Sequence, residues 1–437
     1  MTVRTLLLTA TLPLTLLVPS VAAAATYGPS GLNYSYDIRV DGPTLAGTGA
    51  ITVRNDGPQA MPVVWLRLWG NGGWGCNRPV VRARVTGGGR ADGLMQACTA
   101  LRIRLDAPIA PGDTSTVHVA LRARVPTDHF RTGSWGRMHS FGGVLPTVAP
   151  TVDGRFDLDR YIAIGDPWLL LVGSWHVRLA TPRGVTVGTS GVAQGDLVAP
   201  SGWVRREYVN DMAREFNVVS GPLKVAVGDA DGVPVRVLYG PGTPRRAAVR
   251  LVGTARRAIS AFAARYGPYP GRHLDVLLAG PSGMEYPSLV ISEPTAPTLV
   301  HEVAHQWFSQ EVGSDGGKEP WLDETMTTYA QMRLLGLTAG CSLTSPLGAY
   351  RPARLSWTLA QFARYPNRLY DAVYDGGACA LAGIAHDIGG AAFDAVLGGW
   401  VAAHQWGVVT TGEFLNFLRT RIPDATMARF LATTGLG

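Results

Sequence analysis

A pair of histidines with metal-binding spacing occurs in the second half of the chain. His301, Glu302 and His305 form an HExxH sequence inside an apolar-rich stretch that predicts a helix from Leu299 to Phe308. On a helix, residues four apart lie one turn apart on the same face, so both imidazoles can reach a single cation. Glu302 is rotated to the side, where a water on that cation would lie. Zinc prefers such ligands, so the spacing predicts a zinc-dependent hydrolytic site.

A third ligand is predicted from a second helical pattern that begins at Glu319-Pro320. Proline is favoured in the first turn of a helix, and Glu324 lies 19 residues after His305. A further turn of the first helix, a loop and the start of an antiparallel helix fit this interval. Two histidines and one glutamate leave a fourth zinc position open, as in catalytic rather than structural sites. The alternative, two core histidines and a helix glutamate without metal, is disfavoured by this second match.

The elements that must position these ligands fall into two parts. From about Tyr34 to Val219, apolar residues alternate or cluster between Gly, Pro and Asp turns, which predicts strands and an all-β, sandwich-like domain. The segment from Ala247 to Tyr266 has the spacing of an amphipathic helix, and helical patterns prevail from Thr298 onward. We therefore expect an α+β multidomain chain, with an N-terminal β domain at 26–228 and a mainly helical catalytic domain at 229–437.

The first residues have the order of a secretory signal peptide. Arg4 precedes an apolar run from Leu6 to Val18, and small residues follow up to Ala25. We expect residues 1–25 to be removed during export, so that the mature protein is secreted. No later stretch reaches the roughly eighteen apolar residues of a membrane-spanning helix, so no stable membrane insertion is expected.

Four cysteines occur, an even number that favours disulfides in an exported protein. Of the three possible pairings we favour Cys76 with Cys98 and Cys341 with Cys379, because each pair then lies inside one predicted domain. The second bridge would close a loop of 38 residues and contribute about 3 to 4 kcal/mol to stability. No CxxC occurs, which disfavours a metal site built from cysteines.

Composition excludes several protein classes. Of the 437 residues, 46% are hydrophobic and 16% are charged, an ordinary globular mixture that rules out disorder or coiled coil for most of the chain. The 39 Lys and Arg against 32 Asp and Glu give a net charge of +7, which is weak evidence for nucleic acid binding. Arginines such as Arg82, Arg84, Arg122 and Arg124 alternate with apolar residues, as on the solvated face of strands. We therefore expect no nucleic acid partner.

The motifs resemble those of a known family, the M1-type gluzincin aminopeptidases that include aminopeptidase N and leukotriene A4 hydrolase. Their signature is HExxH, then eighteen residues, then a Glu in a WLNE-like helix, and the corresponding residues here are His301 to His305 and Trp321 to Glu324. Gly283-Met284-Glu285 resembles the family's GxMEN segment, and Val373 to Ala378 resembles its YEKGA segment. The β-rich first half also looks like the family's first domain.

The resemblance implies a fold, a metal and a set of roles. The catalytic part would be a thermolysin-like, mainly helical zincin domain that binds one Zn²⁺ per chain through His301, His305 and Glu324. Glu302 would act as the general base, and Tyr374 would donate its phenol to the oxyanion. The chain would be a secreted zinc aminopeptidase acting on peptide substrates, in a short form without the large C-terminal helical domain of longer members.

The resemblance also implies a substrate-binding segment. Gly283, Met284 and Glu285 would bind the substrate, with the Glu285 carboxylate on its free α-ammonium and the backbone adding a strand to the peptide. The family's Asn after this Glu is Tyr286 here, and the Lys of its YEKGA segment is Gly376. These departures leave the zinc ligands intact and concern the segments that would hold the ends of the substrate.

Other interpretations stay open. No match occurs to the PCxDEP-like segment that supplies an amine-binding acid from the first domain, for which Asp166-Pro167 is a poor substitute. An open cleft would also permit a zinc endopeptidase, and the same fold can serve a non-catalytic binding protein. Tyr374 could be a packed core tyrosine, and Glu285 a surface carboxylate beside a turn. The sequence does not predict the oligomeric state.

Overall fold

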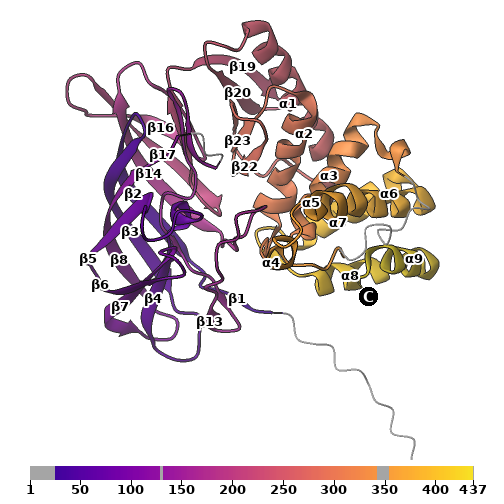
Figure 1. Cartoon of the computed structure of the whole chain (residues 1–437), viewed down its shortest axis with the longest axis horizontal. Helices are drawn as coiled ribbons and strands as arrows, with labels where there is room; N and C mark the ends of the chain where they lie inside the picture. Colours follow the sequence, from indigo (N-terminus) through magenta and orange to yellow (C-terminus); the bar gives the residue numbers. More distant parts are fainter. Residues whose placement is uncertain (1–24, 128–130, 342–353, 437) are drawn as a thin grey trace, which may run out of the picture.

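The structure, a computed structural model, describes residues 25–127, 131–341 and 354–436. The sheets of the first half occupy one side of the molecule, and the second half, with most of the helices and a further sheet, occupies the other (Figure 1). The α+β architecture expected from the sequence is confirmed, with a multi-sheet β domain first and a mainly helical part second. The predicted signal peptide at 1–25 lies outside the described residues except for Ala25.

Two sheets of the β domain share one core. The larger has the strand order β16 (Val192–Leu197), β17 (Trp203–Ala213), β14 (Gly173–Pro182), β2 (Leu32–Asp41), β3 (Thr44–Arg54), β8 (Thr114–Arg124) and β5 (Val81–Gly87). The smaller has the order β11 (Thr147–Val148), β4 (Met61–Arg67), β7 (Ala100–Ile109) and β6 (Gly89–Met95). Every second residue of β2 is buried, because alternate side chains of a strand point to opposite faces. Tyr34 and Trp175 stack in this core with ring centroids 4.0 Å apart.

Smaller sheets connect the sandwich to the helical part. One has the order β15 (Thr186–Thr189), β18 (Val218–Gly221), β10 (Met138–Phe141) and β9 (Thr132–Trp135). Another consists of β1 (Tyr27–Gly28), β12 (Thr151–Val152) and β13 (Arg155–Phe156). The strand β9 follows Arg131, whose carbonyl accepts a hydrogen bond of 2.8 Å from the phenol of Tyr286. The side chain of Tyr286 therefore packs under the β domain instead of facing a substrate.

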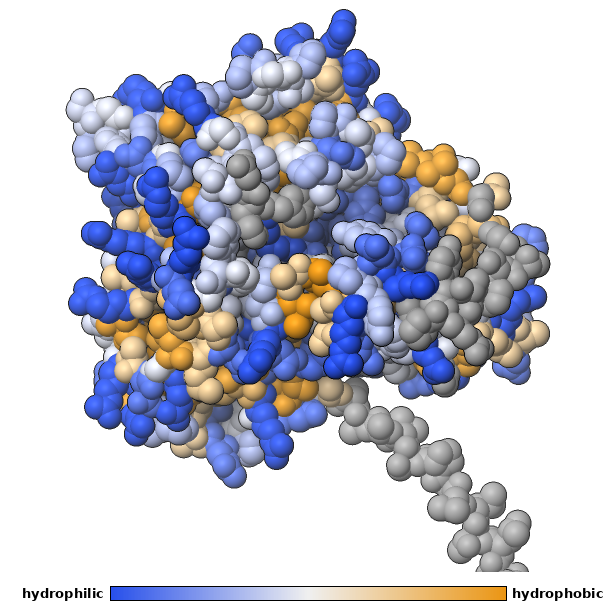
Figure 2. Space-filling model, in the orientation of Figure 1, coloured by the Kyte–Doolittle hydropathy of each residue, from blue (hydrophilic) through white to orange (hydrophobic). Residues whose placement is uncertain are grey.

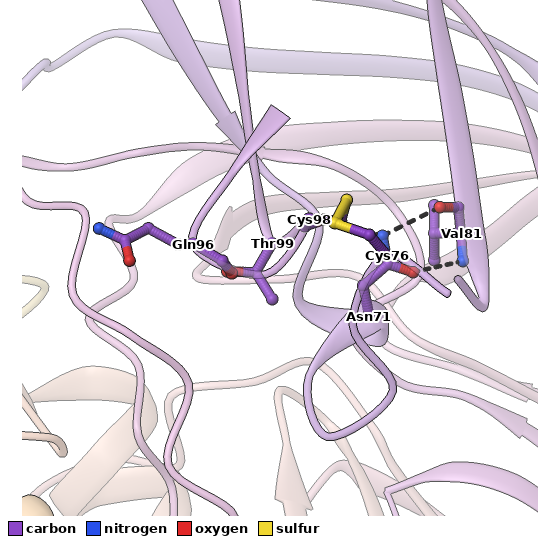
Figure 3. Close-up of a disulfide and its surroundings, with 6 residues drawn as sticks. All are labelled: Asn71, Cys76, Val81, Gln96, Cys98 and Thr99. Atoms are coloured by element: carbon purple, nitrogen blue, oxygen red, sulfur yellow. Dashed lines mark hydrogen bonds between the residues drawn. A yellow bond between two sulfur atoms is a disulfide. The ribbon is translucent and has the colours of Figure 1, made fainter. Parts of the chain in front are cut away.

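A disulfide ties the loop after the short helix η1 (Trp69–Asn71) to the start of β7. Cys76 pairs with Cys98, as favoured from the sequence (Figure 3). The buried amide of Asn71 supports this region, because its Nδ2 donates to the carbonyls of Val81 and Cys98. Its Oδ1 accepts from the N–H of Val81. The loop is thus held by a covalent bond and by a fully satisfied side chain.

The second part is built on a five-stranded sheet. Its order is β19 (Lys224–Ala230), β20 (Val233–Tyr239), β21 (Leu274–Leu278), β23 (Leu289–Ser292) and β22 (Met284–Tyr286). β22 runs antiparallel to β23 and forms the edge. The boundary predicted at residue 228 lies inside β19, so the change between the two parts occurs before Lys224. Gly228 is not a linker residue: a Cβ there would lie 2.5 Å from Val252, so glycine allows the next helix to pack closely.

Helices cover this sheet and complete the second core. They are α1 (Arg245–Tyr266), α2 (Ala296–His305), the π-helical η2 (Gln306–Glu311), α3 (Trp321–Leu335), η3 (Thr338–Gly340), α4 (Leu359–Phe362), α5 (Asn367–Leu369), the π-helical η5 (Tyr370–Gly376), α6 (Gly377–Ile388), α7 (Gly390–Ala403), α8 (Thr411–Arg419) and α9 (Asp424–Thr434). A short parallel pair, β24 (Gly313–Ser314) and β25 (Val408–Val409), lies among them. The second favoured disulfide, Cys341 to Cys379, is also present.

Two further features are the hydropathy of the described helices and that of the face seen in Figure 2. Within the described residues, no single helix is long and apolar enough to cross a membrane. Only Asn367–Ile388 and Gly390–Ala403 taken together, across a bend of 119°, meet that standard. On the face seen in Figure 2, hydrophilic residues predominate and hydrophobic residues form separate small patches.

Two cationic side chains join the two parts. Arg214 follows β17, and its guanidinium donates to four carbonyl oxygens, those of Leu170, Gln310, Glu311 and Gly407. The ammonium of Lys318 pairs with three carboxylates, those of Asp157, Asp159 and Asp315. Both contacts cross from the β domain to the segment between α2 and α3. They therefore fix the loops around the candidate site.

Candidate metal centre and substrate pocket

The predicted zinc ligands lie on two neighbouring helices. Pro297 is in the first turn of α2, where a missing N–H leaves no broken hydrogen bond, and His301 and His305 follow on one face. α3 begins after Pro320 and carries Glu324 in its first turn. Because α2 and α3 pack against each other, this carboxylate reaches both imidazoles.

The three ligand atoms meet at one point. The Nε2 atoms of His301 and His305 are 3.1 Å apart, and Oε2 of Glu324 lies 3.2 Å from the first and 3.4 Å from the second. Burial opposes the charge of Glu324, but the two imidazoles hold the pKa of this carboxyl below its usual range. An ionised carboxylate and two ring nitrogens in this arrangement fit zinc, with a position left for water or substrate.

Further polar side chains orient the two imidazoles. Nδ1 of His305 lies 2.6 Å from Oδ1 of Asp323 and 3.1 Å from the hydroxyl of Thr327, and Nδ1 of His301 lies 3.3 Å from Oε1 of Gln331. These partners turn each Nε2 toward the common point, and a carboxylate behind a histidine makes it a stronger ligand. Burial raises the pKa of Asp323 to about 6. The family's WLNE pattern has Asn at this position, so the carboxylate is a property of this chain.

Replacing Asp323 by asparagine is expected to weaken zinc binding about tenfold. The amide keeps the shape of the side chain and can still accept a hydrogen bond from His305, but the negative charge behind the imidazole is lost. Competition with a chelating dye measures the dissociation constant. Asp394→Asn is the control, because Asp394 is also buried but pairs with Arg333. Equal zinc affinity in the Asp323 variant and the wild type would contradict the expectation.

Glu302 lies beside the ligands with an unpaired oxygen. Its side chain is buried, and among the described residues its Oε2 has no hydrogen-bond partner. Burial raises the pKa of this carboxyl well above its usual range, and the carboxylates of Glu285 and Glu324 add to the effect. A Cβ on Gly283 would lie 1.7 Å from Oε1 of Glu302. Glycine at 283 is therefore required by the position of the Glu302 carboxylate.

The predicted substrate segment forms the edge strand of the sheet. Met284 and Glu285 belong to β22, which pairs with β23 as the edge strand. The carbonyl of Glu285 accepts a hydrogen bond from Gln310 and that of Tyr286 accepts one from Gln306, so these two groups are already occupied. Met284 is buried and serves packing. The Glu285 carboxylate lies within 4.8 Å of ligand atoms of Glu302 and His305. It is thus part of the site and not a surface carboxylate beside a turn.

Tyr374 also borders the metal ligands. It lies in η5, and its ring stacks on that of His301 with centroids 5.9 Å apart and planes 20° apart. Burial, together with the neighbouring Glu324 carboxylate, holds the pKa of the Tyr374 phenol well above its usual value. The phenol therefore keeps its proton and can donate it in a hydrogen bond. Tyr374 also lines a small cavity with Asp323 and Glu324.

Sequence reasoning missed one acid of this region, Glu215, which follows β17. It is buried and lines a small cavity together with Glu285 and Gln310. Burial raises the pKa of Glu215 to about 7, and the charge of Glu285 adds to the effect. The available sequence signal was two adjacent charged residues, Arg214 and Glu215, between apolar residues at a strand end.

The lining of this cavity is rich in acceptors. Its volume is about 30 Å³, room for a group the size of a water or an ammonium. Gln310 donates its amide to the carbonyl of Glu285 at 2.7 Å, which leaves its buried Oε1 without a partner among the described residues. Asp166 also lines the cavity but forms an ion pair with Arg131. Glu215, Glu285 and Gln310 thus offer oxygens that a small cation with several N–H groups can satisfy.

Comparison with known proteins relates part of the chain to one family. Residues 284–432 match the family model described as the Peptidase family M1 domain. Human aminopeptidase RNPEPL1 is 32% identical over 187 residues, which are 39% of this chain and 26% of that protein. Human aminopeptidase B is 26% identical over 193 residues, which are 38% of this chain and 30% of that protein. The matches thus span less than a third of these two relatives.

Solved structures share the fold over nearly the whole chain. The M1 zinc metallopeptidase from Deinococcus radiodurans aligns with a TM-score of 0.69 at 20% identity, covering 92% of both chains. A mutant of that protein bound to a Tyr-Ser-Ala substrate aligns with a TM-score of 0.70 at 20% identity, covering 94% of this chain and 96% of the other. At this identity the likeness shows a common fold.

Proposed function

Because the chain carries a peptidase family M1 domain at residues 284–432, we propose that it is a zinc-dependent aminopeptidase that hydrolyses the N-terminal bond of peptides. The observation that carries this proposal is the convergence of His301, His305 and Glu324, with Glu302 and Glu285 at their side. The first three supply the ligand atoms of a zinc site, and the other two supply a base and an anchor for an amine.

The proposed metal is one Zn²⁺ per chain, held by His301, His305 and Glu324. When bound, zinc polarises the scissile carbonyl and lowers the pKa of water to about 7. Asp323 behind His305 keeps that imidazole oriented and basic. The three ligands come from α2 and α3, two well-packed helices, so little ordering is needed when the metal binds.

In the proposed reaction Glu302 moves the proton. Its unpaired Oε2 accepts a proton from the attacking water, whose oxygen forms the bond to the carbonyl carbon. When the C–N bond breaks, the same carboxyl returns the proton to the leaving amine, so the proton balance closes. Tyr374 donates its phenol to the oxygen that becomes negative in the tetrahedral state. The raised pKa of Glu302 makes its carboxylate a stronger base toward water, and the raised pKa of Tyr374 keeps its phenol protonated as a donor.

An N-terminal ammonium is proposed to enter the small cavity beside Glu285. The carboxylates of Glu285 and Glu215 and the free Oε1 of Gln310 are the acceptors it would meet. The cavity of about 30 Å³ has no room for a further residue of a peptide. This supports an exopeptidase over the alternative of an endopeptidase, in which a chain would continue past the site.

The proposed function is tested with one peptide in two forms, with a free and with an acetylated N-terminus. An aminopeptidase releases free amino acids from the first form only, whereas an endopeptidase cleaves both. A binding protein on the same fold cleaves neither. Equal cleavage of the two forms by the zinc-loaded protein would therefore overturn the aminopeptidase proposal, and cleavage of neither would overturn the peptidase proposal.

Glu215→Gln is expected to raise KM for unblocked peptides about tenfold, because a neutral amide attracts an ammonium less than a carboxylate does. Glu215 has a pKa of about 7 in the free protein, so lowering the pH from 8 to 6 protonates it and raises KM in the wild type. The variant loses this part of the pH dependence. The control is Glu207→Gln. Glu207 lies in β17, the strand that precedes Glu215, and its carboxylate pairs with Arg178 away from the cavity. An unchanged KM and pH profile would exclude Glu215 from substrate binding.

We also propose that the protein is secreted, with residues 1–25 as a cleaved signal peptide. The proposal rests on the charged, apolar and small-residue order of this segment. Sequencing the N-terminus of protein recovered from the medium tests it, and a chain that starts near Thr26 is the expected result. Full-length chain confined to the cytosol would contradict it.

A further inference from the structure

A groove in the β domain is lined by arginines. It has a volume of about 1590 Å³ and lies between β3, β8 and β5 of the large sheet and the β9–β10 hairpin. Six of its lining residues are arginines, namely Arg78, Arg82, Arg122, Arg124, Arg137 and Arg183. All six are exposed. Asp41 is the one acid among the described residues that line it.

Many exposed arginines of the β domain have an acidic partner, but the six groove arginines have none in the part of the chain that the structure describes. Arg102 and Arg104 pair with Asp92, and Arg205 pairs with Asp37. None of the six groove arginines has an ion pair or side-chain hydrogen bond with the described residues. Arg84, Arg90, Arg155 and Arg160 are also exposed without an ion pair to any described residue, but six unpaired guanidinium groups line this one groove.

The strand register places two of these charges face to face. Arg82 of β5 lies directly opposite Arg122 of β8 in the antiparallel pair. Like charges at directly opposed positions destabilise a sheet. Both side chains are exposed, and neither forms an ion pair with another described strand or helix. The pair therefore contributes no contact that stabilises the fold. A bound anion would convert the repulsion into two favourable contacts.

We propose that this groove binds a linear phosphate-rich polymer that carries no bases. The planar guanidinium forms paired hydrogen bonds with phosphate oxygens, and a row of them suits a chain of evenly repeated phosphates. Binding of single-stranded nucleic acid relies on aromatic rings on which bases stack. Among the described lining residues, Trp74 is the one Phe, Tyr or Trp side chain. The lining therefore favours a backbone of phosphates over a nucleic acid.

The groove is separate from the candidate metal centre. It shares no lining residue with the two cavities beside the metal ligands. In Figure 1, β5 and β8 lie on the side of the β domain that faces away from α3 and α6. A polymer in the groove would leave the metal centre accessible and would hold the protein at a phosphate-rich surface. The inference does not depend on the proposed peptidase activity.

The experiment measures binding of labelled inorganic polyphosphate to the full-length mature protein by fluorescence anisotropy. The double variant Arg82→Ala/Arg122→Ala is expected to bind about tenfold more weakly, and the slope of log affinity against log salt should fall by about 1.4, the contribution of two contacts to a single-stranded polyanion. Arg205→Ala/Arg206→Ala removes the same charge from paired positions of the same sheet. This control should lose less than half as much affinity.

Two outcomes would overturn the proposal. One is equal loss of polyphosphate affinity in both double variants, because net charge alone would then explain binding. The other is tighter binding of a thymidine oligonucleotide of equal charge, because the groove would then recognise nucleic acid. The melting temperature of Arg82→Ala/Arg122→Ala should equal or exceed that of the wild type, since a repulsive pair is removed. Zinc content should stay unchanged in both double variants.

Discussion

Glu302→Gln is expected to lower kcat for an unblocked peptide about a thousandfold, within the range for loss of a general acid–base group. Glutamine fits the same space against Gly283 but cannot accept and return a proton. Because the carboxyl is buried with an unpaired oxygen, the neutral amide should cost no stability. Zinc content should also be unchanged, since the ligand atoms belong to other residues. The measurements are kcat, zinc content and the melting temperature of the same preparation.

A matched control comes from the π-helical segment η2 that follows α2. Glu311 in η2 is also buried, and burial raises its pKa to about 7, but its Oε1 accepts a hydrogen bond from Gln405 outside the metal cluster. Glu311→Gln should keep kcat within about threefold of the wild type. If Glu302→Gln and Glu311→Gln lose activity equally, the role assigned to Glu302 is wrong.

Glu324→Ala is expected to abolish stable zinc binding and with it the stabilisation that zinc gives. The change removes the anionic ligand and leaves two imidazoles whose Nε2 atoms lie 3.1 Å apart. In the wild type, zinc at about a thousand times its dissociation constant should raise the free energy of unfolding by about 4 kcal/mol. The variant should show no such increase and less than 0.1 zinc per chain, on the order of background. Metal analysis and thermal unfolding with and without zinc measure both effects.

A second cluster, of three carboxylates, provides a control variant for the loss of a carboxylate. Asp157, Asp159 and Asp315 also place oxygens within 4.8 Å of one another. The ammonium of Lys318 already lies among them, at 3.0 Å from Asp159 and 2.8 Å from Asp315. Asp159→Ala should therefore leave zinc content at one per chain. A full zinc complement in Glu324→Ala would show that the metal is held elsewhere.

Predictions from local spacing agree with the geometry. His301, Glu302 and His305 lie within five residues of one helix, so helical periodicity alone sets which side chains share a face. The prediction of Glu324 as third ligand required one further assumption, that a helix beginning near Pro320 runs antiparallel to the first helix. Both favoured disulfides are present, and they were favoured because each joins two cysteines of one predicted domain. The boundary expected at residue 228 lies inside β19, where Gly228 packs against α1.

Features that join distant segments were not predictable in this way. Glu215 and Glu285 are 70 positions apart in the sequence, and they border one cavity only because the β domain packs on the edge strand β22. Tyr286, which replaces the family's Asn, donates its phenol to the carbonyl of Arg131. This hydrogen bond joins the catalytic part to the β domain. Neither the shared cavity nor this hydrogen bond can be predicted from a short stretch of sequence.

What the sequence determined by itself is the chemistry and spacing of the metal ligands and the order of a β part and a helical part, because these follow from the short periods of helices and strands. Tertiary structure alone decided which acids surround the amine pocket and which arginines line one groove. Arg82 and Arg122 read in sequence as solvated strand residues, and each is indeed exposed. Their opposition depends on the register between two strands, which long-range packing fixes and single-strand periodicity does not.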